Sequence, residues 1–176
     1  MQAVDLQAGV EVGGASMLDY AGALVSAAEG LTHPIGLVGW SSGGLAALLA
    51  AEQIRPSSLV LLEASPPSEV QGSDADLQIG DGLFDPEAVY GPFPPGVRSR
   101  PESIRALGER KRGLSVPAVP CPALVVYGHE FPEERGRALA ALYGAEQLSF
   151  PDLDHWGLVL DARVRQAIAR WLGENS

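Results

Sequence analysis

A glycine-rich turn between two apolar segments constrains this 176-residue chain more than any other feature. An apolar run at residues 35–38 leads into the turn, and an Ala/Leu-rich segment at residues 45–51 leaves it. The run predicts a strand, and the segment after the turn predicts a helix that is apolar nearly all round. Such a helix must be buried against a sheet. The centre of the chain therefore predicts a layered structure of strands and helices.

Within the turn, Gly39, Ser41 and Gly43 fit the pattern G-x-S-x-G. Between a strand and a helix this pattern predicts a nucleophile elbow, in which a strained turn lifts the serine hydroxyl above the strand end. The residues two before and two after the serine are expected to crowd the backbone, where only glycine leaves room. The N–H of Ser42 and the positive end of the helix would face a developing oxyanion. An ordinary Gly/Ser turn is the alternative, and the flanking strand and helix favour the elbow.

The rest of the chain alternates strand-like with helical segments. Alternation of this kind predicts an α/β fold with a mostly parallel sheet of about five strands and helices on both faces. Further strands are expected at residues 3–6, 58–64, 123–127 and 147–150, and helices at residues 16–30, 102–112, 133–143 and from Asp161 onward.

Residues 65–118 differ in character from the segments around them. They are rich in proline, glycine and aspartate, and they contain Phe84, Tyr90 and Phe93. A long mobile linker is one interpretation. An excursion of this length between two core strands is more often a lid or a binding loop. We therefore expect one domain over residues 1–176, with residues 65–118 as its lid.

Charge and cysteine content exclude several classes of function. The net charge of −10 argues against binding to nucleic acid or to anionic membrane surfaces. A single cysteine, Cys121, excludes an internal disulfide, and no Cys/His cluster predicts a metal site. No phosphate-binding glycine loop is present, so no cofactor is expected. No apolar run approaches the length of a membrane span, and residues 1–5 do not resemble a signal peptide, so a cytoplasmic location is expected.

A serine hydroxyl is inert at neutral pH unless a base accepts its proton. His155 follows the last predicted strand, and the carboxyl ends of parallel strands lie together at one edge of a sheet. Because the pKa of histidine lies in the working range, His155 is the expected general base for Ser41. A surface loop histidine is the alternative for His155 and the expected role of His33.

These features together resemble the α/β-hydrolase superfamily over almost the whole chain. The Gly39–Gly43 elbow, the buried strands at residues 58–64 and 123–127, and residues 154–157 (Asp-His-Trp-Gly) support the resemblance. It implies an acyl-enzyme mechanism in which Ser41 attacks and His155 moves the proton. A serine at the elbow, in place of an aspartate, argues against a dehalogenase-type alkyl-enzyme.

The resemblance leaves the acid of the triad open between two glutamates. The family usually places it after the strand that corresponds to residues 123–127, but the expected position holds Phe131, and Glu130 lies one residue earlier. Other members place the acid after the strand that follows the elbow helix, where Glu63 lies. A carboxylate there needs a partner, because burying it unpaired is costly, and the ring of His155 would be such a partner.

The N-terminal region departs from the family pattern. The family has more strands before the elbow, and the loop after one of them supplies a second oxyanion donor. Here the loop at residues 7–14 is the candidate, and the strand at residues 3–6 is expected to pair beside the elbow strand. An open sheet edge would favour pairing with a second copy as a homodimer. The chain is expected to be a shortened family member: a minimal hydrolase, an incomplete gene product or a fragment that needs a partner.

The function expected from these residues is hydrolysis of a small carboxylic ester or thioester. Ser41, His155 and one of the two glutamates would form the catalytic triad, with Ser42, Trp40 and Trp156 at the oxyanion and substrate sites. A C–C or amide hydrolase on the same triad is a related possibility. The alternative is a catalytically weak or inactive hydrolase-like module that binds a small molecule or a partner protein. The missing oxyanion donor and the open choice of acid support that alternative.

Overall fold

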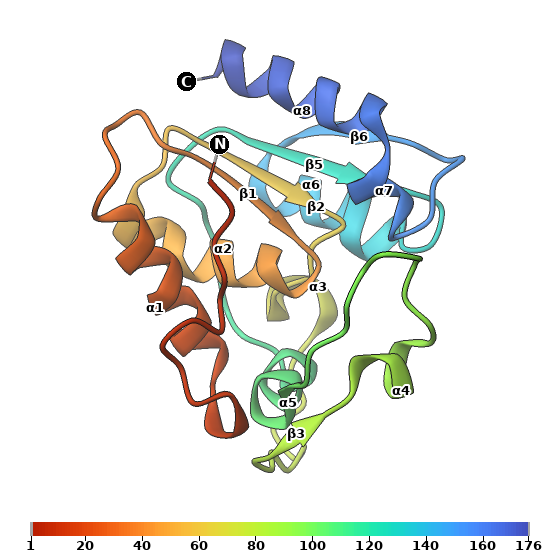
Figure 1. Cartoon of the computed structure of the whole chain (residues 1–176). Coiled ribbons are helices and arrows are strands. Elements are labelled where there is room, and N and C mark those ends of the chain that lie inside the picture. Colours follow the sequence, from red (N-terminus) through yellow and green to blue (C-terminus); the bar gives the residue numbers. More distant parts are fainter. Residues whose placement is uncertain (1, 176) are drawn as a thin grey trace.

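The computed structural model describes residues 2–175 and has a parallel sheet at its centre (Figure 1). Its four strands are β1 (Gly36–Trp40), β2 (Ser58–Leu62), β5 (Ala123–Tyr127) and β6 (Glu146–Ser149), in the spatial order β1-β2-β5-β6. Every neighbouring pair in this sheet is parallel. The predicted α/β class is therefore confirmed, and the main sheet has four strands where about five were expected.

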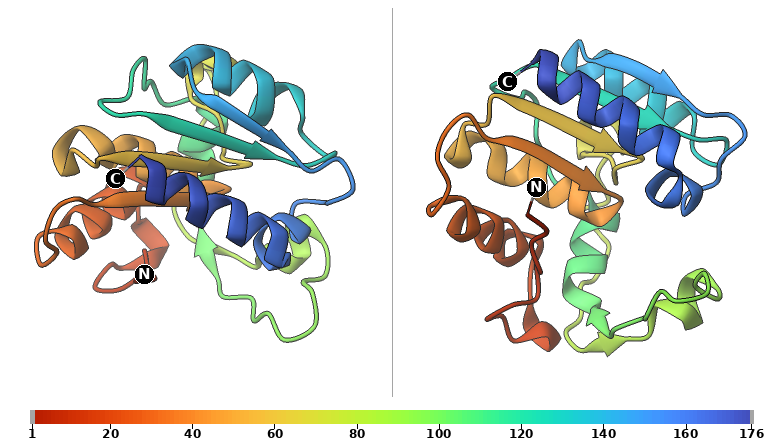
Figure 2. Two further views of the ribbon diagram at one scale, coloured as in Figure 1. Left: turned by 90° about the horizontal axis from the view of Figure 1, so that it is seen from above. Right: turned by 45° about the horizontal axis from the view of Figure 1, so that its top comes forward.

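Helices cover both faces of the sheet, and α8 lies across one of them (Figure 2). Leu59, Leu61 and Val125 face a core that includes residues of α1, α2 and α6. The alternate residues of β2 and β5 face the core formed with α7 and α8. The two central strands are fully buried, which explains why they read as continuous apolar runs in the sequence. The helices are α1 (Met17–Ala28), α2 (Ser42–Ile54), α6 (Ala138–Tyr143), α7 (Gly157–Leu160) and α8 (Ala162–Glu174).

Helix caps follow the sequence closely. Ser16 and Asp19 form a capping box at the start of α1, and the Asp161 side chain accepts a hydrogen bond from Arg163 N at the start of α8. The helix expected at residues 133–143 is divided into a π-helical segment, η2 (Glu133–Arg137), and α6. Among the described residues, no helix has the length and apolar character needed to cross a membrane.

The strand expected at residues 3–6 is not formed, and this prediction was wrong. The segment turns instead, since Ala8 N donates to Asp5 O and Val10 N donates to Gln7 O. The Asp5 carboxylate pairs with Arg100 at 2.8 Å. These contacts hold the segment away from the sheet, so β1 is an edge strand with no described residue paired to its outer side.

The excursion, residues 65–118, contains short elements of its own. They are α3 (Ser68–Gln71), β3 (Leu83–Phe84), α4 (Pro86–Tyr90), β4 (Glu102–Ser103) and α5 (Ile104–Arg112). Strands β3 and β4 pair in an antiparallel ribbon, and the helix expected from residue 102 begins at Ile104. Figure 1 shows the excursion below the sheet, with one loop (green) rising toward α7.

Candidate active site

Ser41 connects β1 to α2 in a conformation that L-residues rarely adopt. Its φ is 53° and its ψ is −125°. Backbone hydrogen bonds tie it to the end of β2: Ser41 N donates to Leu62 O at 3.2 Å, and Ser65 N donates to Ser41 O at 2.8 Å. Ser42 is the first residue of α2, so its N–H belongs to the positive end of that helix. The local geometry is that of a nucleophile elbow at the carboxyl end of β1.

Close packing at the elbow requires two glycines. A Cβ on Gly39 would lie 2.6 Å from Gly44 Cα, and a Cβ on Gly44 would lie 2.3 Å from Ala64 Cβ. A Cβ on Gly43 would have only Leu6 Cδ1 near it, at 4.0 Å. The expectation of crowding is correct at Gly39 and wrong at Gly43. The first turn of α2 faces Gly44 toward the end of β2, so Gly44 takes the crowded position.

Glu63 contacts the imidazole of His155. It follows β2, its φ is 41°, and it is fully buried. Its Oε2 lies 2.5 Å from His155 Nδ1, and its Oε1 accepts a hydrogen bond from Gly128 N at 3.1 Å. Both carboxylate oxygens therefore have partners, which offsets the cost of burying the group. A bond at Nδ1 leaves His155 Nε2 available for a proton from another group.

Glu130 also contacts His155, but through the backbone. Its Oε2 accepts a hydrogen bond from His155 N at 2.9 Å. The neighbouring Asp154 Oδ1 accepts from Gly157 N at 2.6 Å. Of the two glutamates left open by the sequence, Glu63 meets the ring and Glu130 holds the loop. Glu63, Glu130 and His155 also offer three ligand atoms within 4.8 Å of one another, a donor set suited to a divalent cation.

A row of aromatic rings joins the elbow strand, the histidine loop and the excursion. The Trp40 ring lies 4.7 Å from the ring of His155 and 4.8 Å from that of Trp156, and the Trp156 ring lies 4.7 Å from that of Phe93. Trp40 Nε1 donates to His155 O at 3.2 Å. The structure thus brings Trp40 and Trp156 to the site, as the sequence predicts. Phe84 packs against Tyr90 in a separate pair.

Trp40 links Ser41 to His155 indirectly. The Trp40 side chain packs on His155, and its backbone leads directly into Ser41. Glu63, the partner of His155, follows Leu62, whose carbonyl accepts from Ser41 N. Among the described residues Ser41 Oγ makes no hydrogen bond. His33 is exposed, in agreement with its expected surface role.

Phe131 and Arg135 lie beside this cluster, and the sequence did not predict that. The Phe131 ring stands edge-on to the His155 ring, with 6.1 Å between centroids. The Arg135 guanidinium lies over Phe131, 4.1 Å from its centroid. Burial lowers the pKa of Arg135. The one signal in the sequence is their spacing: an arginine four residues after a phenylalanine is on the same side of a helical turn.

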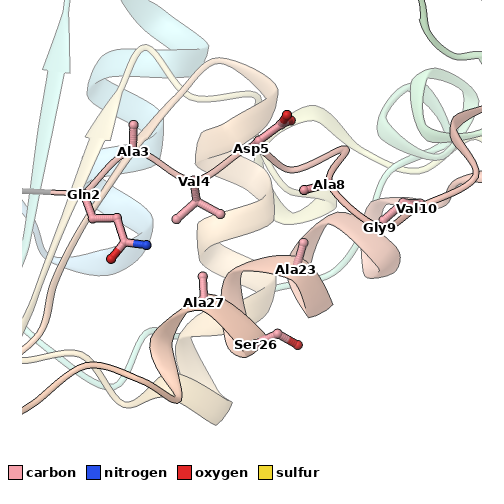
Figure 3. A pocket seen from close by; sticks show the side chains of 10 residues that line it. All are labelled: Gln2, Ala3, Val4, Asp5, Ala8, Gly9, Val10, Ala23, Ser26 and Ala27. Atoms are coloured by element: carbon pink, nitrogen blue, oxygen red, sulfur yellow. The ribbon is translucent and has the colours of Figure 1, made fainter.

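Two cavities lie apart from these residues. One of about 370 Å³ lies between the N-terminal segment and α1, where the side chains of Gln2 and Val4 point toward Ala23 and Ala27 (Figure 3). The other, of about 490 Å³, lies between Leu18 of α1 and residues of the excursion. Neither of the two is lined by the residues around His155.

Comparison with known proteins establishes the fold. The sequence matches no protein-family model and no curated protein. The structure is similar to tomato methylketone synthase I, which was crystallised with 2-tridecanone. The TM-score is 0.56 at 15% identity, over 92% of this chain and 80% of that one. At this identity the similarity shows a shared α/β fold.

A second similar structure is a YdeN-like hydrolase from Pectobacterium atrosepticum SCRI1043. The TM-score is 0.45 at 16% identity, over 77% of this chain. The chain spans 56% of the length of that protein.

Proposed function

We propose that the chain is a serine hydrolase that cleaves small carboxylic esters or thioesters through an acyl-enzyme on Ser41. The observation that best supports this is the 2.5 Å contact between buried Glu63 and His155 Nδ1. A buried carboxylate on a histidine ring is the pair that activates a serine, and Ser41 lies at a strained turn next to Trp40, whose ring packs on that histidine. The similar YdeN-like protein is described as a hydrolase.

In the proposed reaction His155 moves one proton during acylation and a second one during deacylation. Nε2 accepts the proton of Ser41 Oγ as that oxygen attacks the ester carbonyl carbon, and it then donates this proton to the departing alcohol or thiol. Nε2 then accepts a proton from a water molecule as this water attacks the acyl-enzyme, and it passes that proton to Ser41 Oγ as the acid is released. Glu63 stabilises the imidazolium, and Ser42 N–H donates to the oxyanion.

In this function the excursion acts as a lid. The contact between Phe93 and Trp156, with 4.7 Å between ring centroids, supports that role because Trp156 adjoins the base. Trp40 and Trp156 form an apolar wall beside His155. The apolar part of an acyl chain would bind along the aromatic row, because the aromatic rings offer it an apolar surface in place of water.

A hydrolase-like binding module is the second candidate, and two observations favour it. Ser41 Oγ makes no hydrogen bond with any described residue. The loop expected to provide the second oxyanion donor uses several of its N–H groups in its own turns: Gln7 N donates to Asp5 Oδ1, and Val10 N donates to Gln7 O. Loss of one oxyanion donor typically costs about 10²–10³ in rate.

Labelling with a fluorophosphonate probe separates the two candidates. In the hydrolase, the probe attaches to Ser41, intact-mass spectrometry shows one adduct, and the protein hydrolyses p-nitrophenyl butyrate. Ser41→Ala and His155→Ala remove both signals. Ser26→Ala, at an exposed serine of α1, retains them as the matched control. Folded wild-type protein that takes no label and turns over no ester is the binding module.

A further inference from the structure

Two guanidinium groups of this chain are largely withdrawn from water without a full anionic partner. They belong to Arg135 in η2 and to Arg110 in α5 of the excursion. The Nε atoms of both are buried and have no hydrogen-bond partner. A buried donor without a partner costs free energy and calls for an explanation.

Arg135 lies next to the candidate active site. Its guanidinium is 4.1 Å from the centroid of Phe131, whose ring stands against His155. It forms no ion pair with any described residue. The charged and ionisable groups close enough to act on its pKa include Glu63 and Arg110. Arg135 thus lies between the catalytic cluster and the helix that carries Arg110.

Arg110 has two weak partners. Its side chain is 13% exposed, and Nη2 lies 3.9 Å from Glu102 Oε2 and 3.4 Å from the Tyr90 hydroxyl. Burial raises the pKa of Glu102, which disfavours the charged form of that carboxyl. The Arg110 fork therefore retains donors that no described group satisfies.

Charge composition does not explain this arrangement. The chain has 22 acidic and 12 basic residues, so carboxylates are abundant. Exposed cations such as Lys111 and Arg170 are solvated and need no partner. Two nearby, partly buried cations repel each other, and an anion between them would relieve that repulsion. The planar fork of arginine fits a carboxylate or phosphate group with paired hydrogen bonds.

We propose that Arg110 and Arg135 bind an oxyanion on the substrate, so that the preferred ester has a carboxylate or phosphate group on its acyl chain. This inference rests on the proposed function. One phenyl ring separates Arg135 from His155, so an acyl chain of a few carbon atoms joins the scissile carbonyl to the anionic group. The net charge of −10 repels anionic substrates at long range, and a local pair of cations overcomes that repulsion at the site.

The test compares two esters of equal chain length in the full-length chain. Mono-p-nitrophenyl glutarate has a terminal carboxylate, and p-nitrophenyl valerate has a methyl group in its place. The ratio of kcat/KM for the glutarate ester to that for the valerate ester is expected to fall about tenfold to a hundredfold in Arg135→Gln and in Arg110→Gln, because each variant loses a charge-assisted hydrogen bond to the carboxylate. Arg170→Gln and Lys111→Gln remove the same charge at exposed positions, and they keep the wild-type ratio.

Calorimetric titration with glutarate and with inorganic phosphate identifies the anion. The anion that binds more tightly identifies the group as a carboxylate or a phosphate, and Arg135→Gln abolishes its binding. This readout remains decisive if the wild type hydrolyses neither ester. If it then binds one of the anions, the proposed function fails and the oxyanion site stands. It also remains decisive if Arg110→Gln does not fold.

Three results overturn the inference. One is an unchanged glutarate-to-valerate ratio in folded Arg135→Gln. Another is an equal fall with both esters, which shows that Arg135 acts on Glu63 and leaves substrate selection unaffected. The third is the absence of binding by both anions to folded wild-type protein.

Discussion

Ser41 and Glu63 share an uncommon backbone conformation at the ends of neighbouring strands. Their φ values are 53° and 41°. Such residues cost about 1–3 kcal/mol each and persist where the surroundings hold them. Here Ser41 N donates to Leu62 O, and Glu63 N donates to Val126 O at 2.7 Å. Both residues therefore lie at the carboxyl edge of the sheet, where the Glu63 carboxylate contacts the ring of His155.

The different contacts of the two glutamates lead to a prediction. Glu63→Gln, which weakens the bond at His155 Nδ1 and the stabilisation of the imidazolium, should lower kcat for p-nitrophenyl butyrate by about 10³–10⁴. Glu130→Gln keeps an oxygen that accepts from His155 N, so its kcat should fall by no more than about tenfold. Steady-state kinetics of both purified variants provide the comparison. Equal losses would contradict the assignment of Glu63 as the acid.

The partly buried carboxyl of Glu102 predicts a pH dependence of stability. Because burial raises its pKa in the folded chain, the folded chain binds this proton more tightly than the unfolded chain does. The stabilisation that Glu102 contributes is fully present below its pKa in the unfolded chain. It is lost as pH rises through its pKa in the folded chain. Urea midpoints of wild type and Glu102→Gln, measured from about pH 4 to about pH 8, should diverge in favour of the variant as pH rises. A constant difference would show that Glu102 titrates alike in both states.

At the scale of elements, the elbow depends on the close approach of α2 to the end of β2. Gly44 packs on Ala64, and the same contact fixes where the helix starts relative to Ser41. The N-terminal end of α2 is therefore positioned by packing and not by a side-chain cap, since the Ser41 side chain makes no cap bond. This packing holds Ser42 N–H, the proposed oxyanion donor, in place.

Alanine at the two helix glycines should have opposite effects. Gly44→Ala should lower the free energy of unfolding by about 1–3 kcal/mol, because its Cβ would overlap Ala64. Gly43→Ala should raise it by about 0.4–1 kcal/mol, since the site is open and alanine favours a helix. Thermal and urea unfolding followed by circular dichroism measure both. Destabilisation by Gly43→Ala as large as that by Gly44→Ala would contradict the packing described for the elbow.

For the whole molecule, the sheet has one uncharged edge. Strand β1 consists of Gly-Leu-Val-Gly-Trp, has no described partner on its outer side, and leaves Val38 45% exposed. Edge strands without charge or proline readily pair with another chain. The homodimer expected from the sequence stays a prediction at this edge, where two copies of β1 would extend the sheet.

Sedimentation equilibrium tests that dimer. The wild type is expected to show a concentration-dependent dimer that Val38→Lys weakens at least tenfold, because a charge would be placed in the paired edge. Leu160→Lys makes the same change at a residue 51% exposed in α7 and should leave the dimer intact. A monomer at all concentrations, or equal weakening by both variants, removes the edge as an interface.

The sequence alone predicted the elements and their class. The sequence correctly predicted the buried runs of β2 and β5, the capping box of Ser16 and Asp19, and the tight turn at Ser41 between a strand and a helix, because apolar periodicity, caps and tight turns are local properties. The segment at residues 3–6 was read wrongly. Its short apolar run satisfies the strand pattern, while its contact with Arg100 lies far along the chain.

Only the tertiary structure shows that Glu63 contacts the ring of His155 while Glu130 contacts its backbone, and only it brought Arg110 to the neighbourhood of Arg135. Both glutamates lie beyond strand ends in the sequence, but which one reaches the His155 ring depends on strand order and on a backbone turned to positive φ. A single sequence states which residues are present and how they alternate. Packing between elements far apart in the chain decides which side chains lie together in a desolvated environment. Charge pairs are stronger in such an environment than in water.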